Sequence, residues 1–125
     1  MYTSTTENIE VSVQPVYLDG QSNWMEKKFT FAYFIKITNS SNSPVKLLRR
    51  HWYITDGDAA VKEVEGIGVV GKQPIIKPGK SHKYNSFCVL ENMEGSMSGT
   101  YLMKRGSEEV FKISIPKFAL RANAN

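Results

Sequence analysis

Every second position from residue 29 to residue 37 is a large apolar residue, and this alternation constrains the fold more than any other feature of the chain. The alternating residues are Phe29, Phe31, Tyr33, Ile35 and Ile37. A period of two places these five side chains on one face of an extended strand. The segment is therefore predicted to be a β-strand with one buried face.

Shorter runs with the same period occupy residues 9–13 and 110–115, and further strands are expected at 45–55, 59–65, 81–89 and 98–104. No segment combines a helical spacing of apolar residues with capping residues. About seven to eight short antiparallel strands predict an all-β sandwich. Its core is expected to contain Phe31, Tyr33, Ile35 and Trp52.

Turn sequences separate the predicted strands. Asp56-Gly57-Asp58 has the composition of a hairpin turn, and Lys77-Pro78-Gly79-Lys80 places proline second and glycine third. A further turn is predicted at 104–107, where Gly106 follows Lys104-Arg105. These turns are spaced closely enough for strands that are neighbours in the sequence to pair with each other.

The chain of 125 residues is predicted to form one domain, 1–125, with an ordered core at about 7–120 and a polar tail from Arg121 to Asn125. Its one cysteine, Cys88, excludes an internal disulfide and is expected to be a buried apolar side chain. The first residues lack the features of a signal peptide. No apolar run approaches the roughly 20 residues of a membrane span. We therefore expect a cytoplasmic protein without a membrane segment.

The net charge of +4 comes from one part of the chain. Residues 46–83 contain eight lysines and arginines and four aspartates and glutamates, which accounts for the whole excess. This region either attracts anions or is a solvated lysine face. Nucleic acid is not an expected partner, because the charge is modest and stacking aromatic residues are not interleaved with the basic ones.

A glycine pattern at 66–71, Gly66-Ile67-Gly68-Val69-Val70-Gly71, follows the basic segment Arg49-Arg50-His51-Trp52. A dinucleotide site would need a helix after the glycines, and Pro74 argues against one. Two interpretations stay open. The backbone amides form a nest for a phosphate or pyrophosphate group, or the glycines only shape an irregular crossover. The candidate anion-binding residues are Gly66, Gly68, Gly71, Lys72, Arg49 and Arg50.

The sequence contains no set of residues that predicts catalysis. Its two histidines, His51 and His82, and one cysteine are too few for a structural zinc site, and nothing in the local sequence supports a Ser-His-Asp arrangement at either histidine. Asp56 and Asp58 could hold Mg²⁺, but aspartates are also common in turns. We predict no catalytic residue, no metal ligand and no cofactor.

The segments 48–56 and 66–74, together with Pro78-Gly79, Tyr84 and Gly95-Ser96-Met97-Ser98-Gly99-Thr100-Tyr101, resemble the ApaG family. The resemblance covers residues 3–122. It implies an immunoglobulin/fibronectin type III-like β-sandwich and a bacterial protein linked to cobalt and magnesium resistance. It also implies a protein-interaction role, through related domains in eukaryotic proteins, and raises pyrophosphate binding by the glycine pattern. It implies no catalytic residues.

The resemblance and the missing catalytic set together predict a non-enzymatic binding domain with a protein partner. The alternative is a protein that binds pyrophosphate or a dinucleotide polyphosphate through the segment 66–71. Neither prediction requires ion transport by this chain, so a link to cobalt or magnesium would be indirect. The sequence leaves homodimer formation open.

Overall fold

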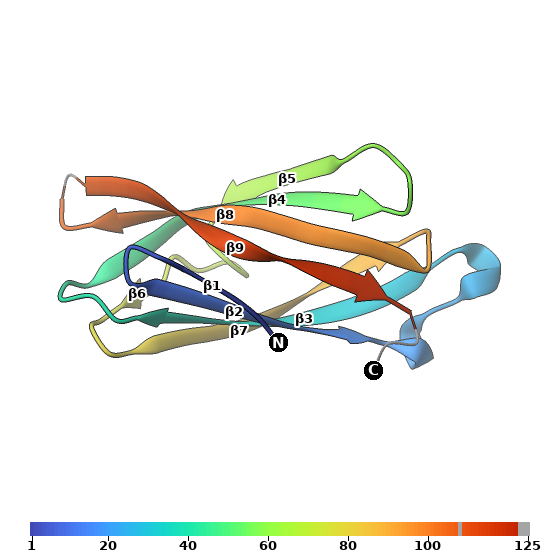
Figure 1. Ribbon diagram of the computed structural model, residues 1–125, viewed down its shortest axis with the longest axis horizontal. Helices are drawn as coiled ribbons and strands as arrows, with labels where there is room; N and C mark the ends of the chain where they lie inside the picture. Colours follow the sequence, from blue (N-terminus) through green and yellow to red (C-terminus); the bar gives the residue numbers. More distant parts are fainter. Residues whose placement is uncertain (108, 123–125) are drawn as a thin grey trace.

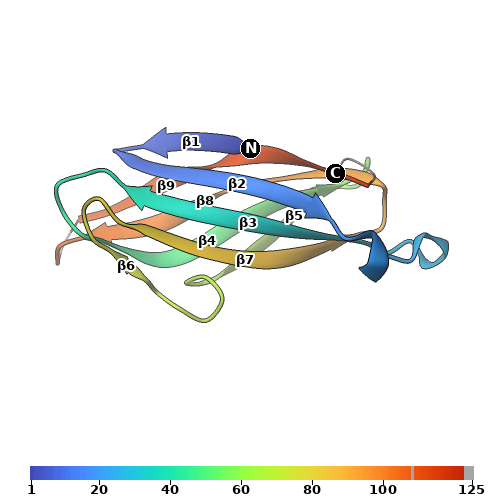
Figure 2. The same ribbon diagram turned by 90° about the horizontal axis from the view of Figure 1, so that it is seen from below.

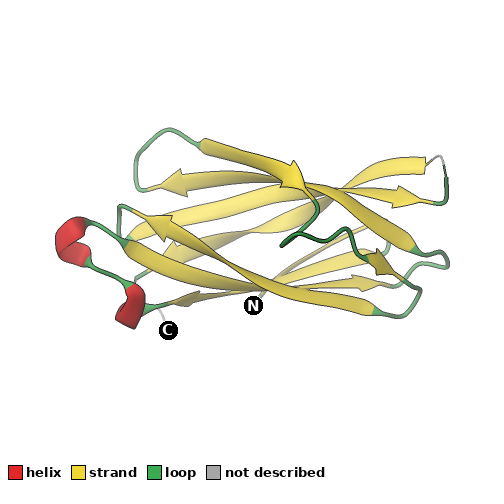
Figure 3. Ribbon diagram, turned by 180° about the vertical axis from the view of Figure 1, so that it is seen from behind, coloured by secondary structure: helices red, strands yellow, loops and turns green. Residues whose placement is uncertain are grey.

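The computed structural model describes residues 1–107 and 109–122, and these form a sandwich of two antiparallel sheets (Figure 1). The predicted all-β sandwich is confirmed. The strands are β1 (Tyr2–Thr6), β2 (Ile9–Tyr17), β3 (Phe29–Asn39), β4 (Val45–Asp56), β5 (Lys62–Ile67), β6 (Ile75–Ile76), β7 (Ser81–Leu90), β8 (Glu94–Arg105) and β9 (Glu109–Arg121). Two single-turn 3-10 helices, η1 (Asp19–Gln21) and η2 (Trp24–Glu26), lie at one end of the sandwich, between β2 and β3 (Figure 3).

One sheet has the strand order β1-β2-β3-β7, and the other has the order β5-β4-β8-β9 with β6 also paired to β4. The described residues form nine strands instead of the predicted seven to eight, because β1 and β6 were not expected. The ordered structure begins before the predicted core 7–120, since β1 pairs with β2 from Tyr2 onward. The missed strand β1 is short and its sequence is almost entirely hydroxyl residues, so it carries no apolar alternation.

The two lateral sides of the sandwich differ. On one side β1 lies against β9, where the Ser4 hydroxyl donates to the Ser114 carbonyl at 2.8 Å and the Ser114 N–H donates to Thr6 Oγ1 at 3.1 Å. On the other side the outermost strands are β7 and β5, and they do not pair. Figure 2 shows β1 close to β9 and β7 at the opposite border of its sheet. One lateral side is therefore open.

The alternating side chains of β3 form the centre of the core. Phe31, Tyr33 and Ile35 are buried as predicted, and so is Trp52 of β4. The Trp52 ring lies 5.3 Å from the Tyr33 ring and 6.0 Å from the Phe118 ring, both edge-on. Such tilted aromatic pairs add to the stabilisation from apolar burial.

A β-bulge in β4 reverses the alternation of that strand. Leu47 pairs with Met103 and Arg49 pairs with the adjacent Leu102, so Leu48 has no partner in β8. Both Leu47 and Trp52 therefore face the core, although the sequence places them at positions of opposite parity. The bulge also fixes Arg50, two residues before Trp52, on the inner face of the sheet.

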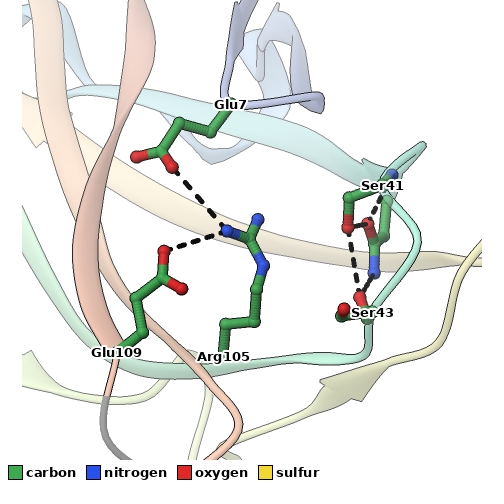
Figure 4. Close-up of polar contacts among 6 residues, drawn as sticks. Glu7, Ser41, Ser43, Arg105 and Glu109 are labelled. Carbon is green, nitrogen blue, oxygen red and sulfur yellow. Dashed lines mark hydrogen bonds and ion pairs between the residues drawn. The ribbon is translucent and has the colours of Figure 1, made fainter.

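The buried side chain of Asn39, at the end of β3, joins the loop between β3 and β4 to strand β6. Its Nδ2 donates to the carbonyls of Ser43 (2.8 Å) and Ile76 (2.9 Å), and its Oδ1 accepts from the Ser41 N–H (2.9 Å) and hydroxyl (2.5 Å). Figure 4 shows Ser41 and Ser43 of this network close to Arg105, which forms ion pairs with Glu7 and Glu109.

The predicted turns are present. Gly57, Gly79 and Gly106 each have a positive φ, and the Lys80 N–H donates to the Lys77 carbonyl at 3.0 Å. None of the helices in the described ranges is long and apolar enough to cross a bilayer.

Candidate functional site

A cleft of about 570 Å³ lies along the open lateral side, between the facing edges of β5 and β7. Its apolar wall includes Trp52, Val64, Cys88 and Leu90. Arg50 lies toward one end, and Asp56, Lys62 and Glu91 also line it. The cleft exists because the two sheets are joined on only one lateral side.

Arg50 is the principal charged group facing the interior of this cleft. The bulge in β4 turns it inward, and the side chain is half-buried. Its Nη1 donates to the carbonyls of Ile67 and Gly68, both at 3.0 Å. No Asp or Glu in the ranges 1–107 and 109–122 forms an ion pair with it. The guanidinium is therefore held in place by neutral oxygens, and its positive charge is not matched by a carboxylate.

Three tyrosine hydroxyls lie near this guanidinium. Tyr101 is fully buried and its hydroxyl makes a short hydrogen bond to that of Tyr84, while Tyr33 is directly opposite Ser86 in the β3–β7 ladder. Burial raises the pKa of all three tyrosines, and the positive charge of Arg50 opposes this rise in each case. Of the three tyrosines, Tyr33 lines the cleft, so at neutral pH the end of the cleft near Arg50 carries a neutral hydroxyl group beside the guanidinium.

Cys88 forms part of the apolar wall and is buried, as the sequence predicted. Burial, with a smaller contribution from Asp56, raises the pKa of its thiol from about 9.0 to about 11. Since the thiolate is the nucleophilic form, this thiol is poorly suited to covalent chemistry at neutral pH.

We expect the free energy of unfolding to fall as the pH rises above about 9. The unfolded chain releases the Cys88 proton near pH 9.0 and the folded chain near pH 11; Tyr33, Tyr84 and Tyr101 shift in the same direction. Between these values the unfolded state binds fewer protons, so it gains stability relative to the folded state. Urea unfolding from pH 7 to 11 measures the slope. A free energy of unfolding that is constant between pH 8.5 and 11 would contradict this prediction.

The edge of β7 next to the cleft carries free backbone groups. The Asn39 N–H donates to the Lys80 carbonyl (3.0 Å), and the Leu18 N–H donates to the Thr30 carbonyl (2.8 Å). Bonding alternates along an antiparallel ladder, so odd residues of β3 bond to β7 and even residues bond to β2. Asn85, Phe87 and Val89 therefore direct their N–H and C=O groups away from β3. No strand of the described residues pairs with this edge.

The predicted glycine segment forms the end of β5 and a tight turn. The Gly68 N–H donates to the Leu48 carbonyl at 2.8 Å, and Val69 and Lys72 exchange hydrogen bonds of 2.8 and 3.0 Å. Val70 and Gly71 have φ of 47° and 76°, the signs of a type I′ turn. Their amides make no backbone hydrogen bond to any described residue. A phosphate site in this segment would depend on these two amides, and it stays a prediction.

The structure brings only some of the predicted anion-binding residues together. Arg50 lies over Gly66, since a Cβ added to Gly66 would be 2.6 Å from Arg50 Nη2. Arg49 is exposed on the opposite face of β4. Lys72 is exposed, and with burial it lowers the pKa of His82. The six predicted anion-binding residues therefore lie on two faces of the sheet and in one turn, and they do not form a single group.

Alanine should be tolerated better at Gly66 than at Gly68. At Gly66 the new methyl group meets only the end of the Arg50 side chain, which can shift where a backbone atom cannot, so we expect a loss of about 1 kcal/mol or less. At Gly68 it meets the backbone carbonyl of Lys72 where φ is +63°, so we expect about 2–3 kcal/mol. Urea unfolding of both variants provides the comparison. Equal losses of unfolding free energy in the two variants would mean that the backbone at Gly68 can adapt to a side chain.

Other candidate groups serve the structure. His51 lies on the outer face of β4, stacked on Tyr53, with its two ring nitrogens 2.8 and 2.9 Å from carboxylate oxygens of Glu63 and Glu65. Asp56 accepts from the N–H groups of Glu91 (2.8 Å) and Asn92 (3.0 Å), which joins two turns. No group of three or more potential metal ligands occurs within 1–107 and 109–122.

The sequence indicates Arg50 but not the cleft around it. It predicts Tyr33 only as a core residue and gives no indication of a role for Ser86. The cleft depends on which strands end each sheet and on the bulge at Leu48, and neither follows from local periodicity. The alternation of Tyr84, Ser86, Cys88 and Leu90 along residues 84–90 is the one available indication, because it mixes polar with apolar residues on one inward face.

The fold and the cleft define a small β-sandwich domain with one open lateral side. Residues 19–105 match the ApaG domain. The chain is 47% identical over 120 residues to a protein named ApaG from Paramagnetospirillum magneticum, and 46% identical to one from Agrobacterium fabrum. Both alignments cover 96% of this chain and 92% of the relative. The chain therefore belongs to the ApaG family, as its sequence motifs indicated.

A solved structure agrees with this assignment. The crystal structure of a Bordetella pertussis protein given the name ApaA superposes with a TM-score of 0.89 at 39% sequence identity. The superposition covers 94% of this chain and 95% of that one. The two-sheet architecture is thus shared across the length of both proteins.

Proposed function

We propose that this chain is a non-enzymatic protein-interaction domain that binds an extended segment of a partner protein along the free edge of β7. The observation that carries the proposal is the unpaired edge at Asn85, Phe87 and Val89, bordered directly by the cleft. A strand added to a sheet edge gains backbone hydrogen bonds, and alternate side chains enter the adjoining pockets.

The chemistry of the two edges favours β7 over β5. Phe87 and Val89 are 58% and 59% exposed on the outer face beside the β7 edge. The β5 edge instead carries Glu63 and Glu65, and charged side chains discourage strand addition. The cleft lies on the inner side of the β7 edge. A strand added to this edge would therefore have Phe87 and Val89 beside its outer face and the apolar wall of the cleft beside its inner face.

The alternative function is binding of pyrophosphate or a dinucleotide polyphosphate at the segment 66–71. The free amides of Val70 and Gly71 favour it, with Lys72 next to them. It does not use the open lateral side. In either case the link to cobalt and magnesium resistance that the family resemblance implies would act through the partner or the phosphate compound.

A proline at position 87 tests the use of the β7 edge. Phe87→Pro removes an N–H that points to the free edge and leaves the ladder to β3 intact, a position at which strands accept proline. The matched control is Thr5→Pro, because β1 is the other outer strand of the same sheet and the alternation of its ladder directs the Thr5 N–H away from β2. Phe87→Ala shows separately what the side chain contributes.

Peptides selected by the wild-type protein from a displayed library of random dodecapeptides serve as ligands. We expect Phe87→Pro to lower their affinity by at least tenfold, while Thr5→Pro binds as the wild type does. Thermal unfolding of each variant confirms that it is folded. Unchanged affinity in folded Phe87→Pro, or no selected peptide together with measurable pyrophosphate binding by calorimetry, would overturn the proposal.

A further inference from the structure

Arg50 lies where the inward side chains of a strand added to β7 would enter the sandwich. Among the inward residues of β7, Ser86 and Cys88 line the same cleft as Arg50. Residues directly opposite each other in a sheet share a face. A partner residue opposite Ser86 would therefore face inward toward the polar end of the cleft, and the residue two positions away would face its apolar wall.

The polar end of the cleft carries an unmatched positive charge. Arg50 is half-buried, donates only to the Ile67 and Gly68 carbonyls through Nη1, and has no carboxylate partner among the residues that the structure describes. The hydroxyls near it belong to Tyr33 and Ser86 and can donate to an anion. A carboxylate gains most from a guanidinium where water is partly excluded.

The other charged residues that line the cleft do not remove the preference of Arg50 for a carboxylate. Asp56 already accepts hydrogen bonds from two backbone N–H groups and from Asn92 Nδ2 at 2.9 Å. Glu91 and Lys62 are exposed at the other end of the cleft and have opposite signs. The middle of the cleft is formed by Trp52, Val64 and Cys88, which favour an apolar side chain.

We propose that the cleft selects an extended partner segment in which an acidic residue stands two positions from an apolar one, with the acidic side chain bound to Arg50. The proposal rests on the proposed function, because it requires a partner strand on the β7 edge. It specifies the partner further: a protein with an exposed acidic and apolar segment, in contrast to a second copy of this chain or a free phosphate compound.

The test uses the dodecapeptide library on three proteins: wild type, Arg50→Gln and Arg49→Gln. Arg49 is the matched control, since it is the adjacent arginine on the outer face of β4 and outside the cleft. We expect wild type and Arg49→Gln to select peptides with Asp or Glu at one fixed position and an apolar residue two positions away. Arg50→Gln should lose the acidic preference and keep the apolar one.

The affinity of one selected peptide and of its Glu→Gln form is then measured. We expect the Glu→Gln peptide to bind the wild type at least tenfold more weakly and to bind Arg50→Gln as well as the Glu peptide does. The peptide comparison needs only the wild-type protein, so it stands even if Arg50→Gln fails to fold. Equal binding of both peptides by the wild type would overturn the inference.

The outcomes separate the two proposals. Peptides that lose binding with Phe87→Pro but show no acidic preference would overturn the role of Arg50 and leave the β7 interaction in place. Peptides that require Arg50 but tolerate Phe87→Pro would overturn the strand addition and, with it, the spacing proposed here. Displacement of the peptide by millimolar pyrophosphate would identify the guanidinium as a phosphate site. Concentration-dependent dimerisation that Phe87→Pro blocks would identify a second copy of the chain as the occupant of the cleft. Either result would overturn the inference.

Discussion

Replacing Asn39 by alanine is expected to lower the free energy of unfolding by about 3–4 kcal/mol. The side chain is fully buried and makes four hydrogen bonds, to Ser41, Ser43 and Ile76. Each such bond contributes about 1 kcal/mol net, and a buried acceptor left without a donor costs more. A domain of this size has only about 5–15 kcal/mol in total, so the loss would be a large fraction of its stability.

Asn42→Ala is the matched control, because Asn42 lies in the same loop and is exposed. Its effect should stay within about 0.5 kcal/mol. Urea unfolding followed by tryptophan fluorescence measures both variants, since Trp52 is buried. Equal losses for the two asparagines would show that the buried network around Asn39 does not hold the loop between β3 and β4 against β6.

A methyl group at Gly99 should be comparably damaging. A Cβ at this position would overlap the carbonyl oxygen of His51 and would lie 3.1 Å from its carbonyl carbon and 3.2 Å from Trp52 Cα. These atoms are backbone of β4, so no side chain can move aside. Overpacking of this kind costs about 1–3 kcal/mol and sometimes more, and we expect the upper end because two central strands must separate.

Gly20→Ala provides the comparison for Gly99→Ala, since a Cβ at Gly20 meets nothing within 4 Å. It should leave the urea midpoint almost unchanged. Gly99→Ala should also weaken peptide binding in the molecules that stay folded, because β4 carries Arg50. A Gly99→Ala protein as stable as the wild type would mean that the two strands separate there at no cost.

The architecture could be predicted from the sequence because it depends on local patterns. The alternation of apolar residues in 29–37 predicts β3 and its buried face, and the proline and glycine positions predict the turns. The β1 strand could not be predicted in this way, because its residues carry no apolar period and it is held by pairing with β2 and by contacts with β9. Local sequence periodicity does not predict a strand that is stabilised mainly by its contacts with other strands.

The candidate site could be predicted only in part. Arg50 was identified from charge, but it was assigned to the glycine segment and grouped with Arg49. The bulge at Leu48 and the strand order place Arg50 inside the cleft and Arg49 outside it. These features depend on residues far apart in the chain, so they require the tertiary structure. Val70, with a positive φ in a β-branched residue, was likewise not anticipated.

Amide hydrogen exchange along β7 is the most direct test of the central claim, that a partner strand pairs with this edge. In the free protein the amides of Tyr84, Ser86 and Cys88 should be protected by β3, while those of Asn85, Phe87 and Val89 exchange rapidly. Saturation with a selected dodecapeptide should protect Asn85, Phe87 and Val89 by at least tenfold. Unchanged exchange at these three amides, with protection appearing instead at Val70 and Gly71, would contradict the account.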